Sequence, residues 1–161
     1  MARMQLTVSR QPTDEIYSAL LQAAPGWCSK ALLVLRDYPD LSETGLVTIK
    51  QLEPHLLASE RAAAWPGTAM LSGSATVLTY RLNAEVISVL DTAARGLYEW
   101  QQPELPEDLC LLREQNDPWL VTISHERDAY VVLEPHEFEQ LRDRAPAFAA
   151  LLVEEPEANA P

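Results

Sequence analysis

The feature that most constrains the fold of this chain is a set of residues that recurs, in the same order, in its two halves. The first matches share a constant offset of 70 positions. They pair Glu15, Ser18, Leu20, Ala23, Ala24 and Gly26 with Glu85, Ser88, Leu90, Ala93, Ala94 and Gly96. Three later matches pair 35–37 with 112–114, 46–49 with 120–123, and 52–55 with 133–136. Collinear matches of this kind indicate a tandem duplication, with repeat one at about 4–66 and repeat two at about 74–153.

The spacing of apolar residues predicts the elements of the first half. Alternation at residues 4–10 predicts a strand with one buried face, and Thr13 is a candidate N-cap for the helix that follows. The expected order is a strand at 4–10, a helix from Thr13 to Pro25, strands at 32–35 and 46–49, and a helix from Pro54 to about Trp65. Each repeat would then be a strand–helix–strand–strand–helix unit.

The second half shows the same order of patterns with added loops. The expected elements are a strand at 76–82, a helix at 84–94 capped by Asn83, a strand at 109–112, a hairpin of 119–124 and 129–133, and a helix that starts at Pro135 and restarts at Pro146. Residues 154–161 are expected to form a flexible tail. The predicted fold is a single α+β domain over 1–153, a mostly antiparallel sheet with helices packed on one face.

Convergence is the alternative to duplication, because any strand that leads into a helix started by proline can end in Leu-Glu-Pro-His, as 52–55 and 133–136 do. If the duplication is real, the groove between the two repeats is a natural binding site for a small molecule. Specialisation is then expected in the second repeat, which carries the added loops.

The net charge of −12 belongs entirely to the second half of the chain. Residues 1–81 contain seven acidic and seven basic residues, whereas residues 82–161 contain 17 acidic and five basic ones. Such a field repels phosphate backbones and anionic lipid, so we expect neither nucleic-acid nor membrane binding. A basic protein partner would be attracted. The alternative is that the surplus acid only keeps a small protein soluble.

The sequence favours a cytoplasmic location. No apolar signal segment follows Met1, and no apolar run approaches the roughly 18 residues that span a bilayer. Cys28 and Cys110 lie in or beside apolar runs, which is typical of reduced, buried thiols rather than of a disulfide.

Two small sets of residues could carry chemistry, but each has a simpler interpretation. His125, Glu126, Arg127 and Asp128 could serve general acid–base catalysis, with Cys28 as a nucleophile. The favoured interpretation is a structural hairpin turn whose side chains point outward, with Cys28 as a buried thiol. His55 and His136 each follow a proline at an expected helix start, without the additional ligands that a metal site requires. No glycine-rich phosphate loop is present either. We therefore expect no cofactor, no metal and no enzymatic activity.

A proline-rich, acidic insertion in the second half is the strongest candidate for a partner-binding segment. Trp and Tyr are common anchors in protein interfaces when polar groups surround them, and Trp100 could equally well close over the core. The candidate partner-binding residues are Tyr98, Glu99, Trp100, Glu104, Glu107, Asp108, His125, Glu126 and Asp128.

Three resemblances bear on function. The stretch from Leu105 to Tyr130 resembles a segment of small uncharacterised bacterial proteins and implies no activity. In size, acidity and lack of motifs the chain is similar to bacterial immunity proteins that neutralise toxins. The proposed duplicated architecture resembles the effector-binding modules of the gyrase-inhibitor-like class, which hold hydrophobic cations in an acidic groove.

These observations support three hypotheses in order of preference. The first is a non-enzymatic immunity or inhibitor protein that neutralises a basic bacterial toxin or effector. The second is a small-molecule-binding module with a groove between the repeats, and the third is a hydrolase-type enzyme that uses His125. The oligomeric state is left open.

Overall fold

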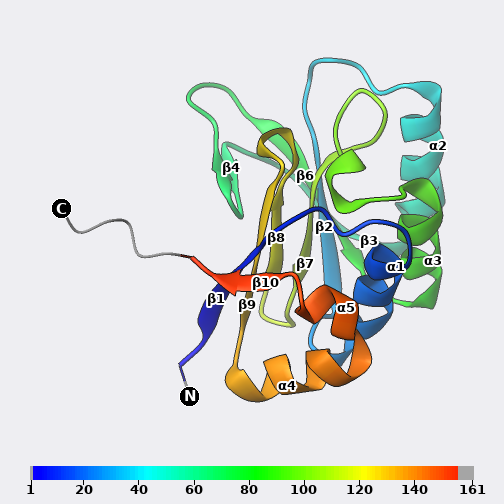
Figure 1. Ribbon diagram of the computed structural model, residues 1–161. Coiled ribbons are helices and arrows are strands. Elements are labelled where there is room, and N and C mark those ends of the chain that lie inside the picture. The colour runs from blue at the N-terminus through cyan, green and yellow to red at the C-terminus, as the bar shows by residue number, and fades with distance from the viewer. Residues whose placement is uncertain (1, 156–161) are drawn as a thin grey trace.

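Eight strands form one antiparallel sheet in the computed structural model, which describes residues 2–155 (Figure 1). The eight strands are β1 (Met4–Val8), β2 (Lys30–Leu35), β3 (Leu56–Ala62), β6 (Ala75–Arg81), β7 (Glu107–Leu112), β8 (Pro118–Ile123), β9 (Asp128–Leu133) and β10 (Leu152–Glu154). Their order across the sheet is β10-β1-β9-β8-β7-β2-β6-β3. The hairpin of 119–124 and 129–133 is confirmed, because Leu120 pairs with Val131.

The helices cover one face of this sheet (Figure 1). They are α1 (Asp14–Ala23), α2 (Glu43–Leu52), α3 (Ala84–Ala93), α4 (Pro135–Arg144) and α5 (Pro146–Ala149), with 3-10 turns η1 (Ala24–Gly26), η2 (Glu53–His55), η3 (Leu97–Glu99) and η4 (Ser124–Glu126). Asn83 caps α3 as predicted, because its side chain accepts a hydrogen bond from the Val86 amide at 2.9 Å. Thr13 holds the N-cap position of α1 without a side-chain bond. The predicted α+β class, with helices on one face, is confirmed.

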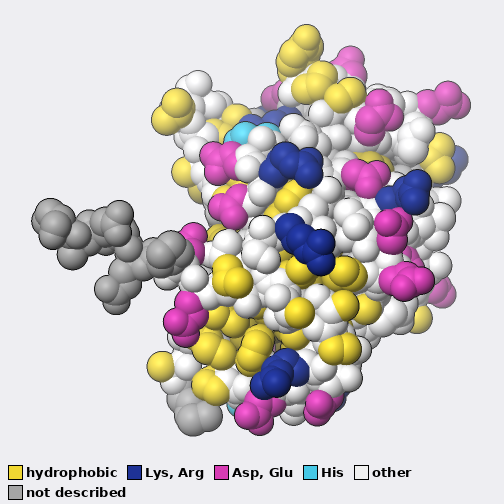
Figure 2. All heavy atoms as spheres, in the orientation of Figure 1, with side chains coloured by type: hydrophobic (Ala, Val, Ile, Leu, Met, Phe, Trp, Pro, Cys, Tyr) yellow, Lys and Arg dark blue, Asp and Glu magenta, His cyan; other side chains and the backbone are white. Residues whose placement is uncertain are grey.

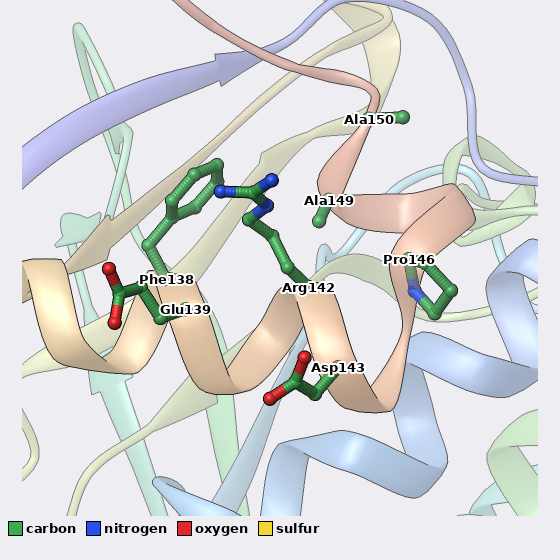
Figure 3. A pocket seen from close by; sticks show the side chains of 7 residues that line it. All are labelled: Phe138, Glu139, Arg142, Asp143, Pro146, Ala149 and Ala150. Carbon is green, nitrogen blue, oxygen red and sulfur yellow. The ribbon is translucent and has the colours of Figure 1, made fainter.

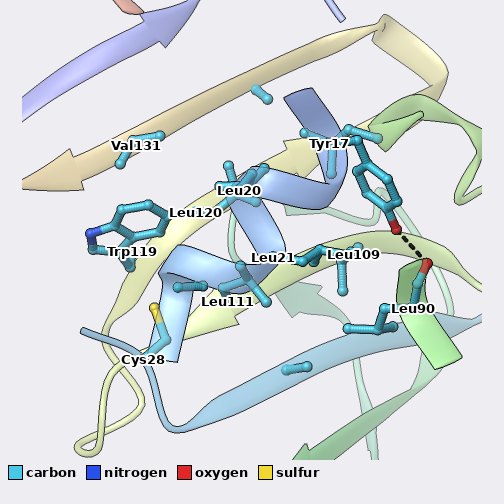
Figure 4. Packing of buried hydrophobic residues seen from close by; sticks show 14 of the residues in the cluster. Tyr17, Leu20, Leu21, Cys28, Leu90, Leu109, Leu111, Trp119, Leu120 and Val131 are labelled. Carbon is cyan, nitrogen blue, oxygen red and sulfur yellow. Dashed lines mark hydrogen bonds between the residues drawn. The ribbon is translucent and has the colours of Figure 1, made fainter. Parts of the chain in front are cut away.

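The main core lies between the helices and the sheet. Tyr17 and Leu20 from α1 meet Leu90 from α3 and the large side chain of Trp119 from β8 (Figure 4). The Tyr17 hydroxyl donates to the Leu90 carbonyl at 2.7 Å, which ties the two helices together. Trp119 and Tyr17 are almost fully buried, and most of the buried apolar residues belong to the cluster on this side of the sheet.

A smaller apolar cluster lies on the opposite face of the sheet. A short hairpin, β4 (Ala64–Trp65) and β5 (Thr68–Ala69), folds back over it and buries Trp65 against the sheet. Gly67 at the hairpin turn has φ +85°, and a Cβ there would lie 2.7 Å from a methyl carbon of Val121. The turn therefore requires glycine both for its backbone conformation and for its close approach to β8.

The strand predicted at 46–49 is wrong, because this segment lies in α2. The Ser42 hydroxyl accepts a hydrogen bond from the Gly45 amide at 3.3 Å and caps the helix. Gly45 and Thr48 then face inward at helical spacing, while Leu46 and Val47 point to solvent. Four consecutive apolar or β-branched residues therefore do not mark a buried strand here.

The helix predicted from Pro54 to Trp65 is also wrong. The 3-10 turn η2 ends at His55, and the chain continues as β3, which pairs with β6. The tetrapeptide at 52–55 thus closes one helix, whereas its match at 133–136 leads into another. The first half does not follow the strand–helix–strand–strand–helix order, and the duplication is not shown.

The C-terminal part was also only partly predicted. Strand β10 pairs with β1 at the sheet edge, which the sequence did not suggest. Most of the tail predicted at 154–161 lies outside the described residues.

Candidate functional site

Two acidic segments of the second half meet at one end of the sheet. Residues 97–108 follow α3, and residues 124–128 connect β8 to β9. The Ser124 amide donates to the Asp108 carboxylate at 2.9 Å. The Arg127 guanidinium lies over the Tyr98 ring at 5.5 Å from its centroid. We call these two segments, 97–108 and 124–128, the acidic end; it contains all nine residues predicted to bind a partner.

The two aromatic residues of the acidic end are buried, which corrects the prediction that they anchor a partner. Trp100 has no exposed surface, and its Nε1 donates to the Tyr17 hydroxyl at 2.9 Å. That hydroxyl in turn donates to Leu90, so Trp100 completes a hydrogen-bonded chain inside the main core. Tyr98 is only 6% exposed. Burial raises the pKa of its hydroxyl, and Asp128 adds to this effect. The other interpretation of Trp100, closure over the core, is confirmed.

Glu107 and Asp108 are buried as well and hold the insertion against the sheet. The Glu107 carboxylate pairs with the Arg36 Nε at 2.5 Å. Asp108 has a positive φ of 58°, and its carboxylate also accepts a hydrogen bond from the Trp65 indole nitrogen at 3.0 Å. Asp108 therefore joins the acidic end to the β4–β5 hairpin. Neither carboxylate is presented to a partner at the surface.

The remaining predicted residues lie at the surface. Glu99, Glu104, His125 and Glu126 are exposed, and Asp128 is half-buried. Arg127 is the only lysine or arginine within the two segments. In Figure 2, acidic side chains recur over the upper part of the face, the end of the molecule to which both segments belong, with Lys and Arg side chains between them. Four carboxylates against one guanidinium give this surface a negative potential.

A hollow of about 470 Å³ lies beside the insertion. It is lined by Thr44, Ala93, Tyr98, Glu99, Gln101, Gln102, Pro103, Glu104 and Leu105. Gln102 anchors the loop, because its amide nitrogen donates to the Arg36 carbonyl and its amide oxygen accepts from the Arg36 amide. The carboxylates of Glu99 and Glu104 in one concave surface suit the ammonium or guanidinium group of a basic side chain.

The proposed set of Cys28, His125 and Asp128 is not assembled. The Ser29 amide, next to Cys28, donates to Leu112 at the end of β7, while His125 follows the far end of β8. Burial raises the pKa of the Cys28 thiol well above its ordinary value, which opposes nucleophilic chemistry. His125 and Glu126 point outward, 3.8 Å apart at their nearest N and O atoms.

The paired histidines do not form a common site. His55 ends η2, where its ring contacts the Asn83 amide at 3.1 Å and the Glu85 carboxylate at 2.9 Å. His136 lies in the first turn of α4, 3.3 Å from the Glu134 carboxylate. Across residues 2–155, no group of three or more metal-ligating side chains is placed to hold a metal ion.

Other hollows lie on the helical side. Between α1 and α3, hollows of about 400 and 540 Å³ share one lining residue, Asp91. A hollow of about 680 Å³ lies beside α4 and α5, where Arg142 extends over the Phe138 ring (Figure 3). The lining residues Glu139 and Asp143 are acidic and flank Arg142, so this hollow has mixed charge.

No protein-family model matches the chain, and no curated protein or solved structure matches it either. Within residues 2–155, none of the helices has the length and apolar character needed to cross a membrane.

Proposed function

We propose that the protein is a non-enzymatic binding protein whose acidic end contacts a basic protein, in the manner of an immunity or inhibitor protein that neutralises a toxin or effector. The observation that carries the proposal is the convergence of 97–108 and 124–128 on one end of the sheet. Segments that are separate in sequence combine their exposed carboxylates into one surface. The surplus of negative charge steers a positively charged protein toward this surface and speeds association.

The rigidity of the acidic end supports the same function. Trp100, Gln102 and Asp108 each fix the insertion through a buried or part-buried side-chain hydrogen bond. A surface held in one conformation loses little entropy when a partner binds. The exposed carboxylates of Glu99 and Glu104 flank the hollow beside α3, so a lysine or arginine of the partner could enter there.

Neutralising this surface is expected to abolish capture of the partner from the native host. The test variant replaces four acids with their amides, as Glu99→Gln, Glu104→Gln, Glu126→Gln and Asp128→Asn. Each lost charge-assisted contact weakens binding by about 1.5–3 kcal/mol, so the combined loss exceeds a thousandfold. Affinity isolation followed by mass spectrometry compares the basic proteins retained by the wild-type chain and by the variant.

A matched control removes the same number of charges elsewhere. It carries Glu114→Gln, Glu139→Gln, Asp143→Asn and Glu154→Gln, all at exposed positions outside the acidic end. We expect this control to retain the partner that the test variant loses. Equal retention by both variants, or capture of partners with no basic surface, would contradict the proposal.

A second candidate function is supported by Asp91, which lines both hollows between α1 and α3. Its carboxylate accepts a hydrogen bond from the Ser18 hydroxyl at 2.5 Å and is half-buried. The groove between α1 and α3 lies between helices from the two halves that the sequence comparison matched. A carboxylate in this groove suits a hydrophobic cation.

The second candidate predicts that cationic hydrophobic compounds raise the melting temperature of the wild-type chain. Asp91→Asn keeps the size of the side chain and removes its charge, so the shift should disappear. Thermal-shift screening with uncharged analogues as controls measures this directly. A panel without effect on the wild type, or an equal shift in Asp91→Asn, rules the groove out as the binding site.

A further inference from the structure

Strand β3 is an unprotected edge of the main sheet. It has seven residues, pairs only with β6, and is exposed at every position except Ala62, which is half-buried. The outer edge of such a strand presents backbone donors and acceptors that another strand can pair with. Leu56 and Leu57 add exposed apolar surface at 39% and 44%.

The usual protection of an edge strand is weak in β3. Charged side chains that reach over the edge normally repel an incoming strand. Of the two charged side chains in β3, Glu60 is exposed, whereas the Arg61 guanidinium turns back toward the sheet and binds both carboxylate oxygens of Asp37 at 2.8 and 2.9 Å. It also donates to the Ser74 carbonyl at 2.8 Å. The irregular pairing at Leu57 leaves the segment 58–62 in regular register with β6.

The two edges of the sheet differ in charge and length. Strand β10, at the other edge, has three residues, ends with Glu154 and is followed by Glu155. Strand β3 and its neighbours β6 and β2 all come from residues 1–81, in which acidic and basic residues balance. Two copies of a chain with net charge −12 repel each other. The balance of acidic and basic residues in 1–81 reduces that repulsion when the copies approach through β3.

We propose that a second copy of this chain pairs with β3 in antiparallel orientation and extends the sheet across a twofold axis. With the axis at Ser59, each Ser59 faces its counterpart, and Ala58 faces Glu60 of the second copy. Leu57 then lies opposite the second copy's Arg61, whose aliphatic stem can cover it. An axis at Glu60 or Arg61 would instead place like charges directly opposite each other, which destabilises a strand pair.

Charge exchange at the twofold axis tests this pairing. The wild-type chain should sediment as a dimer at high micromolar concentration. Ser59→Lys and Ser59→Glu each place two like charges face to face, so each variant alone should weaken the dimer by at least about tenfold. An equimolar mixture of the two variants should recover a dimer that contains one copy of each. Analytical ultracentrifugation gives the masses, and native mass spectrometry identifies the mixed species.

Two controls separate the interface from general effects of charge. Ala147→Lys adds a positive charge at an exposed position of α5 and should dimerise as the wild type does. Because Ser59 is exposed and its hydroxyl is not part of the core, both Ser59 variants should keep the wild-type circular dichroism spectrum and melting temperature. A monomeric wild type at all concentrations overturns the proposal. So does a dimer that the Ser59 variants leave unchanged, or a mixture that stays monomeric.

Discussion

Replacing Trp100 with alanine is expected to lower the free energy of unfolding by about 3–5 kcal/mol. The indole is fully buried against the helical side of the sheet and donates its Nε1 hydrogen to Tyr17. Its removal leaves a cavity and deprives the Tyr17 hydroxyl of a donor at the junction of α1 and α3. Urea denaturation followed by circular dichroism measures the change.

Two comparisons make the Trp100 result specific. Trp100→Phe keeps most of the buried apolar area and should lower the free energy of unfolding clearly less than Trp100→Ala does. The variant that neutralises Glu99, Glu104, Glu126 and Asp128 should have a free energy of unfolding within about 0.5 kcal/mol of the wild-type value. A loss below about 1 kcal/mol for Trp100→Ala would show that this side chain does not belong to the core.

Replacing Arg113 with methionine is expected to lower the free energy of unfolding by about 3 kcal/mol at pH 7. This value is near the lower end of the range for breaking a buried ion pair. Arg113 donates to both carboxylate oxygens of Glu137, at 2.7 and 2.8 Å, and to the Val132 carbonyl at 2.9 Å. Its side chain is 13% exposed and that of Glu137 is 7% exposed. Without the guanidinium, a carboxylate stays buried with no counterion. The double replacement of Arg113 and Glu137 by methionine should recover most of the loss.

The cost of Arg113→Met is expected to depend on pH. Burial alone would raise the pKa of Glu137, but hydrogen bonds from Arg113 and from the Glu134 amide outweigh it and hold the pKa below its ordinary value. The stabilisation by the pair is therefore present above the ordinary carboxyl pKa of about 4.3 and is lost as the pH falls through the lowered value. In Arg113→Met the hydrogen bonds from the guanidinium are lost, whereas burial and the hydrogen bond from the Glu134 amide remain, so Glu137 takes up a proton at higher pH than in the wild type.

Urea midpoints of the wild type and Arg113→Met at several pH values measure this dependence. We expect the urea midpoints of the wild type and the variant to differ strongly at pH 7 and to converge below about pH 4, where Glu137 is neutral in the variant. A difference that stays constant from neutral to acidic pH would mean that the charge of Glu137 is not what makes the substitution costly.

The sequence predicted the fold well where one signal dominated. Alternation alone predicted β1, and the cap at Asn83 predicted where α3 begins. Prediction from the sequence failed between residues 43 and 62, where local sequence signals compete with tertiary contacts. The run 46–49 has strand-like residues, yet Ser42 and the inward spacing of Gly45 and Thr48 favour a helix. The exposed strand β3 carries no alternating pattern because neither of its faces is covered.

The location of the candidate site could be predicted from sequence better than the roles of its residues. Aromatic, acidic and proline residues singled out 97–108, and the density of titratable side chains singled out the turn at 125–128. That the two segments meet depends on the pairing of β7 with β8, which no local pattern specifies. The burial of Trp100 depends on Tyr17, more than 80 positions away in the sequence. The apolar residues beside it, Leu97 and Leu105, were the one available signal that this segment covers core.

The salt dependence of association tests the central claim, that the acidic end steers and binds a basic partner, most directly. The measurement is the association rate constant of the captured partner with the wild-type chain and with the variant that neutralises Glu99, Glu104, Glu126 and Asp128, each at low and high ionic strength. The account predicts a fast wild-type rate that falls steeply with added salt, and a slower variant rate that changes little. Wild-type and variant rates that coincide at every salt concentration would contradict it.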